Sequence, residues 1–191
     1  MNRLKTFSLS LVFVLTVVTV QIYAEQTTGE SDITIRKLES QTVLYTIYRG
    51  EYEKIGRAIG SLYALGVKNK IWPRGSLSCV YLNNPQYVSS EHCLTEIRIP
   101  VGQEAIKLAG TLGDLTDIKA LKAMEIAVVT KPAGQTDLST VYDSLHAWIA
   151  KNGYRAADNA CEIFAANAGM TNYAQMKSEI MIPVQKISPM D

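Results

Sequence analysis

Apolar and polar residues alternate along several short runs of this chain, as they do in strands that are covered on one face. The runs are rich in β-branched and aromatic residues, which favour strands. Glycine, proline or asparagine bounds most of them, as Gly50 does after the first run. The expected strands span residues 42–48, 77–82, 94–101, 124–130, 161–165 and 178–184.

Two longer stretches carry apolar residues at the spacing of a helix. The first stripe consists of Ile55, Ala58, Ile59, Leu62 and Leu65. The second consists of Leu138, Val141, Tyr142, Leu145, Trp148 and Ile149. We expect Gly66 to end the first helix, Thr136 to cap the second, and Asn152 with Gly153 to end it.

The two halves of the chain resemble each other at an offset of 83 residues. "TEIRIPV" at 95–101 matches "SEIMIPV" at 178–184, and "SLYAL" at 61–65 matches "SLHAW" at 144–148. This predicts a duplicated strand–helix–strand–strand module, with module one at about 35–101, a linker at 102–122 and module two at about 123–184. The expected fold class is α+β. Two pseudo-symmetric modules form an antiparallel sheet, with helices on one face and a central ligand cleft.

Both copies of the repeated strand place a carboxylate among apolar residues. Because strand residues alternate between faces, the isoleucines and valines of each copy share one side, which we expect to meet the helices. The other side then carries Glu96 and Arg98 in the first copy, and Glu179 and Met181 in the second. If Val80 and Ile163 also face the helices, then Tyr81, Glu162 and Phe164 join the carboxylate side.

Aromatic rings, a methionine and converging charges on one concave surface are typical of a pocket for small molecules. A carboxylate beside aromatic rings can receive a cationic, largely apolar guest, or it can act as a general acid or base. The alternative is that the glutamates are solvated on an uncovered face of the sheet. Glu96 would then form a surface ion pair with Arg98.

The N-terminus has the pattern of a signal peptide. Arg3 and Lys5 precede an uncharged, mostly apolar run at 7–20, and the small residue Ala24 follows. We predict a signal peptide at 1–24 and export to the periplasm or the outside, with no membrane span left after cleavage. The run is shorter than the ~20 residues of a membrane span, and an uncleaved signal anchor is the alternative.

The formal net charge of +1 becomes −1 when Arg3 and Lys5 are removed, which gives no electrostatic basis for binding nucleic acid. The three cysteines, Cys79, Cys93 and Cys161, are too few for a disulfide framework. A Cys79–Cys93 bridge and three unpaired, partly buried thiols both stay open. No cluster of cysteine and histidine indicates a metal site, and no cofactor is expected.

Taken together, these segments resemble the GyrI-like small-molecule-binding domain, which is found as the effector domain of AraC-type transcription regulators. The resemblance covers roughly residues 35–186 of the domain expected at 25–186, through "YRGEYEKIGRAIGSLYAL", "CVYLNNPQYV", "TEIRIPV", "AVVTKPAGQTDLSTVYDSLHAWIAKNGYR", "CEIF" and "SEIMIPV". It implies a cleft between the modules with a Glu of the last strand as its central polar group, and Glu179 matches that position. Aromatic residues line such clefts, and Tyr81, Phe164 and Trp72 are the candidates here.

The favoured interpretation is an exported, stand-alone protein that binds hydrophobic or cationic small molecules. Its candidate ligand-binding residues are Glu179, Met181, Tyr81, Phe164, Glu96 and Trp72. The alternative, implied by the resemblance, is a hydrolase of electrophilic small molecules with Glu179 as general base. Two further alternatives are a tetrapyrrole binder, by similarity to the SOUL proteins, and an envelope module for protein interaction. The signal-peptide pattern stands where a DNA-binding domain would precede the effector domain, so a role in transcription is not expected.

Overall fold

The computed structural model describes residues 32–84, 87–135, 138–164 and 176–188. Its described strands are β1 (Thr34–Leu38), β2 (Gln41–Arg49), β3 (Ser78–Tyr81), β4 (Leu94–Val101), β5 (Thr116–Leu121), β6 (Met124–Lys131), β7 (Tyr154–Ala156), β8 (Cys161–Phe164) and β9 (Ser178–Lys186). Its described α-helices are α1 (Ile55–Lys68) and α2 (Ser139–Lys151). Every strand expected from the alternating pattern is present, with ends shifted by no more than two residues. We did not predict β1, β5 or β7.

One antiparallel sheet contains all of these strands, in the order β1-β6-β9-β8-β3-β4-β2-β5, with β7 paired to β9. The order β2-β4-β3 in one half matches β6-β9-β8 in the other half. The two halves meet where β3 pairs with β8, with Cys79 opposite Glu162. The prediction of an α+β fold built from two pseudo-symmetric modules is therefore confirmed.

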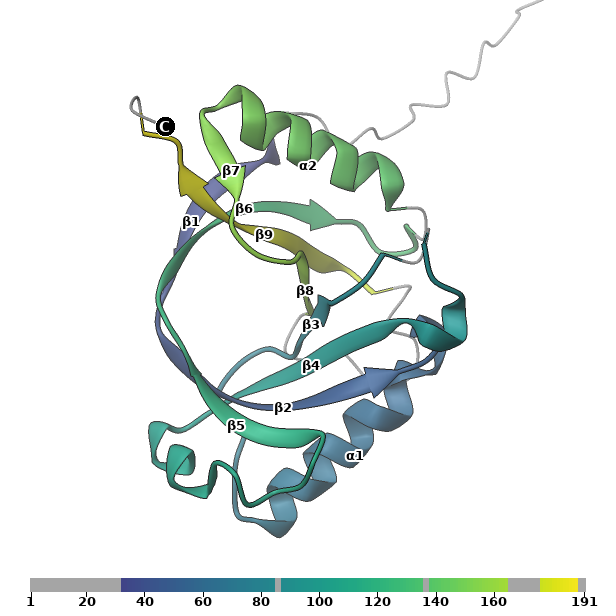
Figure 1. Cartoon of the computed structure of the whole chain (residues 1–191), viewed down its shortest axis with the longest axis vertical. Coiled ribbons are helices and arrows are strands. Elements are labelled where there is room, and N and C mark those ends of the chain that lie inside the picture. The colour runs from purple at the N-terminus through teal and green to yellow at the C-terminus, as the bar shows by residue number, and fades with distance from the viewer. Residues whose placement is uncertain (1–31, 85–86, 136–137, 165–175, 189–191) are drawn as a thin grey trace, which may run out of the picture.

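The outermost strands of the sheet explain why it curls. β1 lies on one edge and pairs with β6, whereas β2, which follows after residues 39–40, lies near the other edge. In the same way β5 pairs with β2, and β6 follows it after residues 122–123. Connections this short cannot cross a flat sheet of this width, so the two edges must approach each other. Figure 1 shows the result, a half-barrel whose open side is crossed by these two connections.

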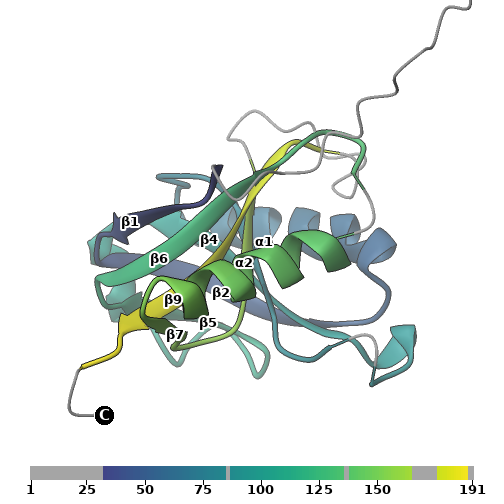
Figure 2. The same cartoon turned by 90° about the horizontal axis from the view of Figure 1, so that it is seen from above.

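The sheet has an outer face, which carries the helices, and an inner face, inside the curl. α1 lies outside β2 at one end of the curl, and α2 lies outside β6 and β9 at the other end (Figures 1 and 2). The predicted apolar stripes meet these helices. Ile97 and Ile99 pack with Ile59 of α1, and Ile180 and Ile182 pack with Leu145 of α2.

The helix ends agree with the sequence in one module only. Gly153 has φ 76° directly after Asn152 caps α2, as expected of an αL cap. Gly66 does not end α1, because the helix continues to Lys68. Gly66 is instead buried where a Cβ would lie 3.1 Å from the carbonyl oxygen of Ile71, so its small size serves packing. The predicted cap Thr136 lies outside the described residues.

The predicted signal peptide at 1–24 also lies outside the described residues. Among the helices that are described, none has the length and apolar character needed to cross a membrane.

Candidate functional site

The sheet register divides the predicted pocket residues between the two faces. Val80 stands opposite Glu96 and therefore shares the inner face with it, whereas Tyr81 stands opposite Thr95 on the outer face. Phe164, opposite Ser178, also lies on the outer face. The expectation that Tyr81 and Phe164 lie on the side of Glu96 and Glu179 is therefore wrong. The prediction assigned the wrong residue of β3 to the helix side. Cys79, and not Val80, packs under α1, so every side chain of β3 lies on the face opposite to the predicted one.

Glu179 and Met181 share the inner face, as predicted, but their surroundings differ. The Glu179 side chain is 39% exposed and forms an ion pair with Arg36 of β1, with 2.7 Å between Oε2 and Nη2. Met181 is buried in an apolar cluster with Val80, Val128 and Cys161. Trp72 lies apart from both, exposed beside a smaller cavity of about 260 Å³ near the end of α1.

Glu96 forms the ion pair with Arg98 that the alternative interpretation predicted, but its carboxylate is buried. Arg98 Nε lies 2.5 Å from Glu96 Oε1, and Lys119 Nζ lies 2.6 Å from the same oxygen. The Glu96 side chain is only 8% exposed, and the Lys119 ammonium lies 4.3 Å from the ring centre of Tyr45. Two cations thus surround one carboxylate on the inner face.

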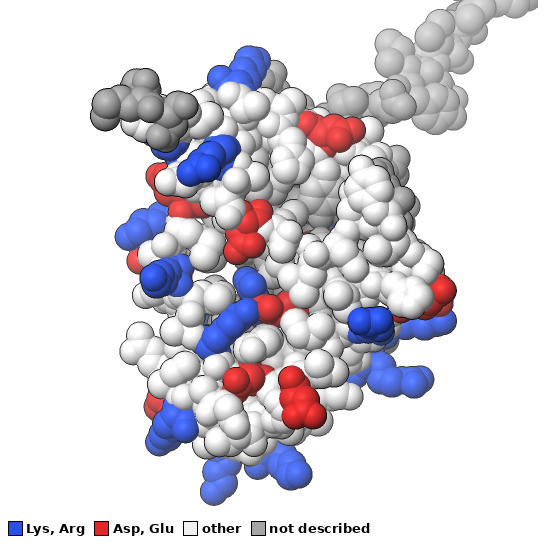
Figure 3. All heavy atoms as spheres, viewed as in Figure 1, with Lys and Arg blue, Asp and Glu red and all other residues white. Residues whose placement is uncertain are grey.

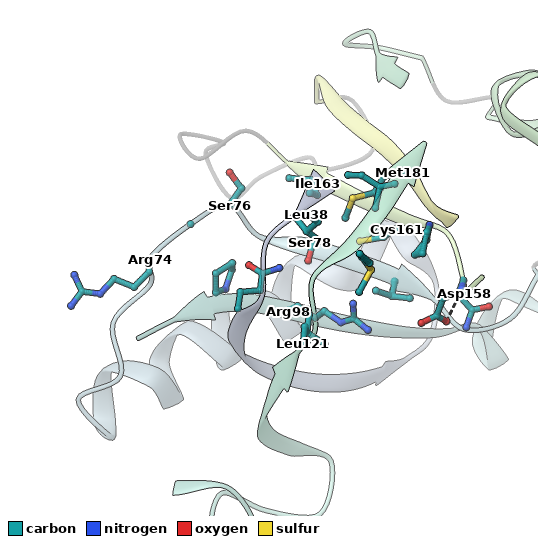
Figure 4. A pocket seen from close by; sticks show the side chains of 18 residues that line it. Leu38, Arg74, Ser76, Ser78, Arg98, Leu121, Asp158, Cys161, Ile163 and Met181 are labelled. Atoms are coloured by element: carbon teal, nitrogen blue, oxygen red, sulfur yellow. Dashed lines mark hydrogen bonds between the residues drawn. The ribbon is translucent and has the colours of Figure 1, made fainter. Parts of the chain in front are cut away.

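A cavity of about 300 Å³ opens inside the curl, between the two modules (Figure 4). Its walls are mostly apolar and come from Leu38, Val80, Leu121, Met124, Ile126, Cys161, Ile163 and Met181. Arg98 extends into it from β4, and Arg74 and Asp158 lie at its rim. On the face of the molecule seen in Figure 3, acidic and basic side chains are interspersed, so no broad area of one sign surrounds the opening.

The outer face carries a second buried carboxylate at the centre of the sheet. Glu162 on β8 is 3% exposed, and its Oε1 lies 2.7 Å from Nζ of Lys131, which is 1% exposed. The Tyr81 hydroxyl donates to Glu162 Oε2 at 2.5 Å, and the Ser178 hydroxyl donates to Oε1. Each carboxylate oxygen therefore has a donor, and the charges of Glu162 and Lys131 cancel. The sequence pattern groups Glu162 with Tyr81 and Phe164, which is correct, but it predicts all three on the side of Glu96 and Glu179, which is wrong, and it does not mark Glu162 as a site residue.

Aromatic rings surround this carboxylate. Tyr81 meets Tyr52 edge to face, with 5.1 Å between ring centres, and Phe164 is buried two residues along β8 from Glu162. Burial and then the charge of Glu162 raise the pKa of Tyr81 well above its usual value. The same two causes, in the same order, raise the pKa of Tyr142 of α2. The charge of Glu162 therefore acts on tyrosines from both modules.

Two buried hydroxyls beside this cluster lack hydrogen-bond partners among the described residues. Within the described part of the chain, Thr95 Oγ1 and the Tyr52 hydroxyl are buried without a hydrogen-bond partner that meets normal geometry. The Cys93 thiol lies close enough to Tyr52 to contribute to its raised pKa, after burial, but a thiol is a weak acceptor. Buried polar groups of this kind are uncommon, and they are expected where a ligand or a water supplies the missing partner.

The remaining reactive side chains offer little chemistry of their own. All three cysteines are free and buried, so a Cys79–Cys93 bridge is not formed. Burial raises the pKa of Cys161, on the cavity wall, to about 12, although the nearby Arg98 charge acts in the opposite direction. The described residues contain no group of three His, Cys, Asp or Glu side chains that could hold a metal ion.

Solved structures with the same fold include EcmrR and a hydrolase. The C-terminal domain of EcmrR aligns with a TM-score of 0.65 and 15% identity, over 81% of this chain and 98% of that one. EcmrR in its complex with DNA gives a TM-score of 0.66 at 15% identity over 81% of this chain, which spans 57% of the longer protein. A hydrolase from Listeria innocua gives a TM-score of 0.58 at 12% identity, over 81% of this chain and 92% of that chain. At these identities, the likeness shows a shared fold alone.

The sequence itself was compared with curated proteins and with protein families. No curated protein matches it. The family model of the GyrI-like small molecule binding domain matches residues 31–185, which include both described α-helices and every described strand except the last residue of β9, Lys186. The chain therefore belongs to the GyrI-like family of small-molecule-binding domains.

Proposed function

We propose that this chain is an exported protein that binds hydrophobic small molecules on the outer face of the sheet, with Glu162 as the central polar group. One observation carries the proposal. A buried, fully hydrogen-bonded carboxylate lies in the central strand β8, among tyrosines from both modules. Membership of a family of small-molecule-binding domains supports it.

The energetic argument is that stability does not require these charges. Removing two ions from water costs several kcal/mol for each ion, and replacing a buried pair by apolar side chains is often neutral or stabilising. Glu162 and Lys131 nevertheless occupy positions in the sheet that an apolar pair could fill. Buried polar groups kept at such a cost are candidates for binding, and the two under-used hydroxyls beside them fit that role.

The electrostatics bear on the class of ligand. Aromatic faces attract cations, and a carboxylate attracts them more strongly. In this chain Lys131 already supplies the counter-charge of Glu162, at 2.7 Å. A lipophilic cation must therefore compete with the Lys131 ammonium, whereas a neutral aromatic compound can use the rings without that competition. We propose neutral hydrophobic compounds as the preferred ligands and lipophilic cations as weaker ones.

Calorimetric titration with two ligands of similar shape tests the proposal. Tetraphenylphosphonium is the cationic probe, and triphenylphosphine oxide is the neutral probe. We expect E162Q/K131M, which removes both charges together, to weaken binding of the neutral probe at least ~10-fold, or about 1.4 kcal/mol, through loss of the polar centre. K131M alone should strengthen binding of the cation, because the Glu162 charge is then unpaired.

Glu179→Gln is the matched control, because it removes a carboxylate on the inner face that is exposed and paired with Arg36. We expect it to leave both affinities unchanged. If Glu179→Gln abolishes binding and E162Q/K131M does not, the central Glu is the residue in the last strand. If neither probe binds to the wild-type protein, binding at this site is rejected. N-terminal sequencing of the protein recovered from its native cells tests export, and a chain that still begins at Met1 would contradict cleavage.

A further inference from the structure

We propose a second binding site, in the cavity inside the curl, which takes an amphipathic carboxylate with its alkyl chain among the apolar walls and its head at Arg98. This site lies on the opposite face of the sheet from Glu162 and does not depend on the function proposed above. The cavity volume of about 300 Å³ lies at the lower end of the range for small-molecule pockets. It corresponds to the liquid volume of about ten water molecules, which is enough for a short alkyl chain.

The walls of the cavity favour an apolar chain. Val80, Ile126, Cys161 and Met181 form a buried cluster, and the partly buried Leu38, Met124 and Ile163 pack against it. These seven side chains all line the cavity. They come from both modules, and Leu38 and Met124 lie directly beside the two connections that cross the open side of the half-barrel. The cavity is therefore a product of the curl.

The charges favour an anionic head group. Arg98 and Lys119 both contact Glu96, so these three side chains together carry one positive charge in excess, and the charges of Arg74 and Asp158, which also line the cavity, cancel each other. Arg98 donates to Glu96 through Nε, and within the described residues its two terminal amino groups have no hydrogen-bond partner. Arg98 lies in the cavity across from Met181 and Ile163, whereas Arg74 points away from it (Figure 4). A planar guanidinium with free amino groups is suited to binding a carboxylate in a bidentate manner.

Three probes with the same alkyl chain test this site: octanoate, octan-1-ol and octylammonium, each titrated by calorimetry into the full protein. We expect octanoate to bind at least ~10-fold more tightly than either of the others. Arg98→Gln should remove that preference, and Arg98→Lys should keep part of it, because the charge remains without the planar fork. Arg36→Gln removes a cation on the same face but outside the cavity, and should leave octanoate binding unchanged.

Methyl NMR spectra locate the ligand even if a variant folds poorly. Octanoate added to the wild-type protein should shift the resonances of Met181 and Ile163, and not those of Val141 and Leu145 in the core under α2. E162Q/K131M should bind octanoate as the wild type does, which separates this site from the outer face. The proposal is overturned if octan-1-ol binds as tightly as octanoate, or if the shifts appear under α2.

Discussion

Glu96 and Glu162 are both buried and both paired with cations, yet they lie on opposite faces of one sheet and in different electrostatic settings. Glu96 has two cations, Arg98 and Lys119, whose side chains are 17% and 34% exposed. Among the described residues, Glu162 has one cation, Lys131, which is almost fully buried, and two hydroxyl donors. The inner network is therefore positive and reaches solvent, whereas the outer one is neutral and closed. This difference is why we assign an anionic ligand to the inner face and neutral compounds to the outer face.

The largest expected effect is on stability, from Lys131→Met. This substitution leaves the Glu162 carboxylate buried without its cation. Breaking a buried ion pair in this way typically costs about 3–5 kcal/mol, and we expect the free energy of unfolding to fall by that amount here. Urea unfolding followed by circular dichroism measures it. The double variant E162Q/K131M should recover most of the loss. If Lys131→Met is as stable as the wild type, the outer network is not closed to water as described.

The next effect is a loss of stability at alkaline pH, caused by the outer face. Burial and the Glu162 charge raise the pKa of Tyr81 and Tyr142, so these phenols stay protonated in the folded state after unfolded tyrosines ionise at pH ~10. Below pH ~10 the phenols are protonated in both the folded and the unfolded state, so the free energy of unfolding does not change with pH through these groups. Above it the unfolded state gains about 1.4 kcal/mol per pH unit for each such tyrosine.

Ultraviolet titration of the phenols, together with unfolding as a function of pH, measures this alkaline effect. Tyr81→Phe should make the loss of stability above pH ~10 shallower. Tyr45→Phe is the matched control on the inner face, where burial and the charges of Asp117 and Glu96 also raise the pKa, but less far than that of Tyr81. The interpretation fails if the Tyr45 variant has the larger influence.

A smaller effect is expected from Arg98→Gln on the inner face. Glu96 keeps Lys119 at 2.6 Å, so the loss should be about 1–2 kcal/mol, below that for Lys131→Met. Thermal unfolding of the two variants under the same conditions gives the comparison. An equal or larger loss for Arg98→Gln would mean that the inner network is as dependent on each partner as the outer one.

The smallest effect is expected from Glu179→Gln, at the rim of the inner face. The Glu179 side chain is 39% exposed and that of its partner Arg36 is 47% exposed. Exposed ion pairs of this kind contribute about 0–1 kcal/mol to the free energy of unfolding. The free energy of unfolding should change by less than about 0.5 kcal/mol, and raising the salt concentration should reduce even that difference. A loss above about 2 kcal/mol would show that Glu179 has a larger role than its position indicates.

Much of the fold could be predicted because its signals are local. The strands at 94–101 and 124–131 and the stripe of α2 follow from the alternation and spacing of neighbouring residues. The sequence pattern does not predict β1, β5 or β7 for a physical reason: each is short and carries charged residues on exposed or half-buried positions, so its pattern alone does not require a strand. They become strands because a neighbouring edge supplies hydrogen-bond partners.

The site could be predicted only in part. The sequence pattern correctly groups Tyr81, Glu162 and Phe164 on one face of the sheet, because side chains alternate between the two faces along each strand. It assigned them to the wrong face, because nothing local says whether Val80 or Cys79 meets a helix. A charged residue in the apolar run "CEIF" was the available signal for Glu162, but its partner Lys131 is 31 positions away and two strands across.

The repeated "EI-IPV" strand shows where local information ends. Short-range pattern determines the order of strands and helices and the apolar stripe of each, because side-chain periodicity is a property of the backbone. It also identifies Ile97 and Ile180 as equivalent core residues of the two modules. Whether Glu96, Glu162 or Glu179 is buried, and beside which cation, depends on strand order and on the curl that brings the edges together. Long-range pairing sets these contacts, and the free energy of a buried charge depends on all of its neighbours at once.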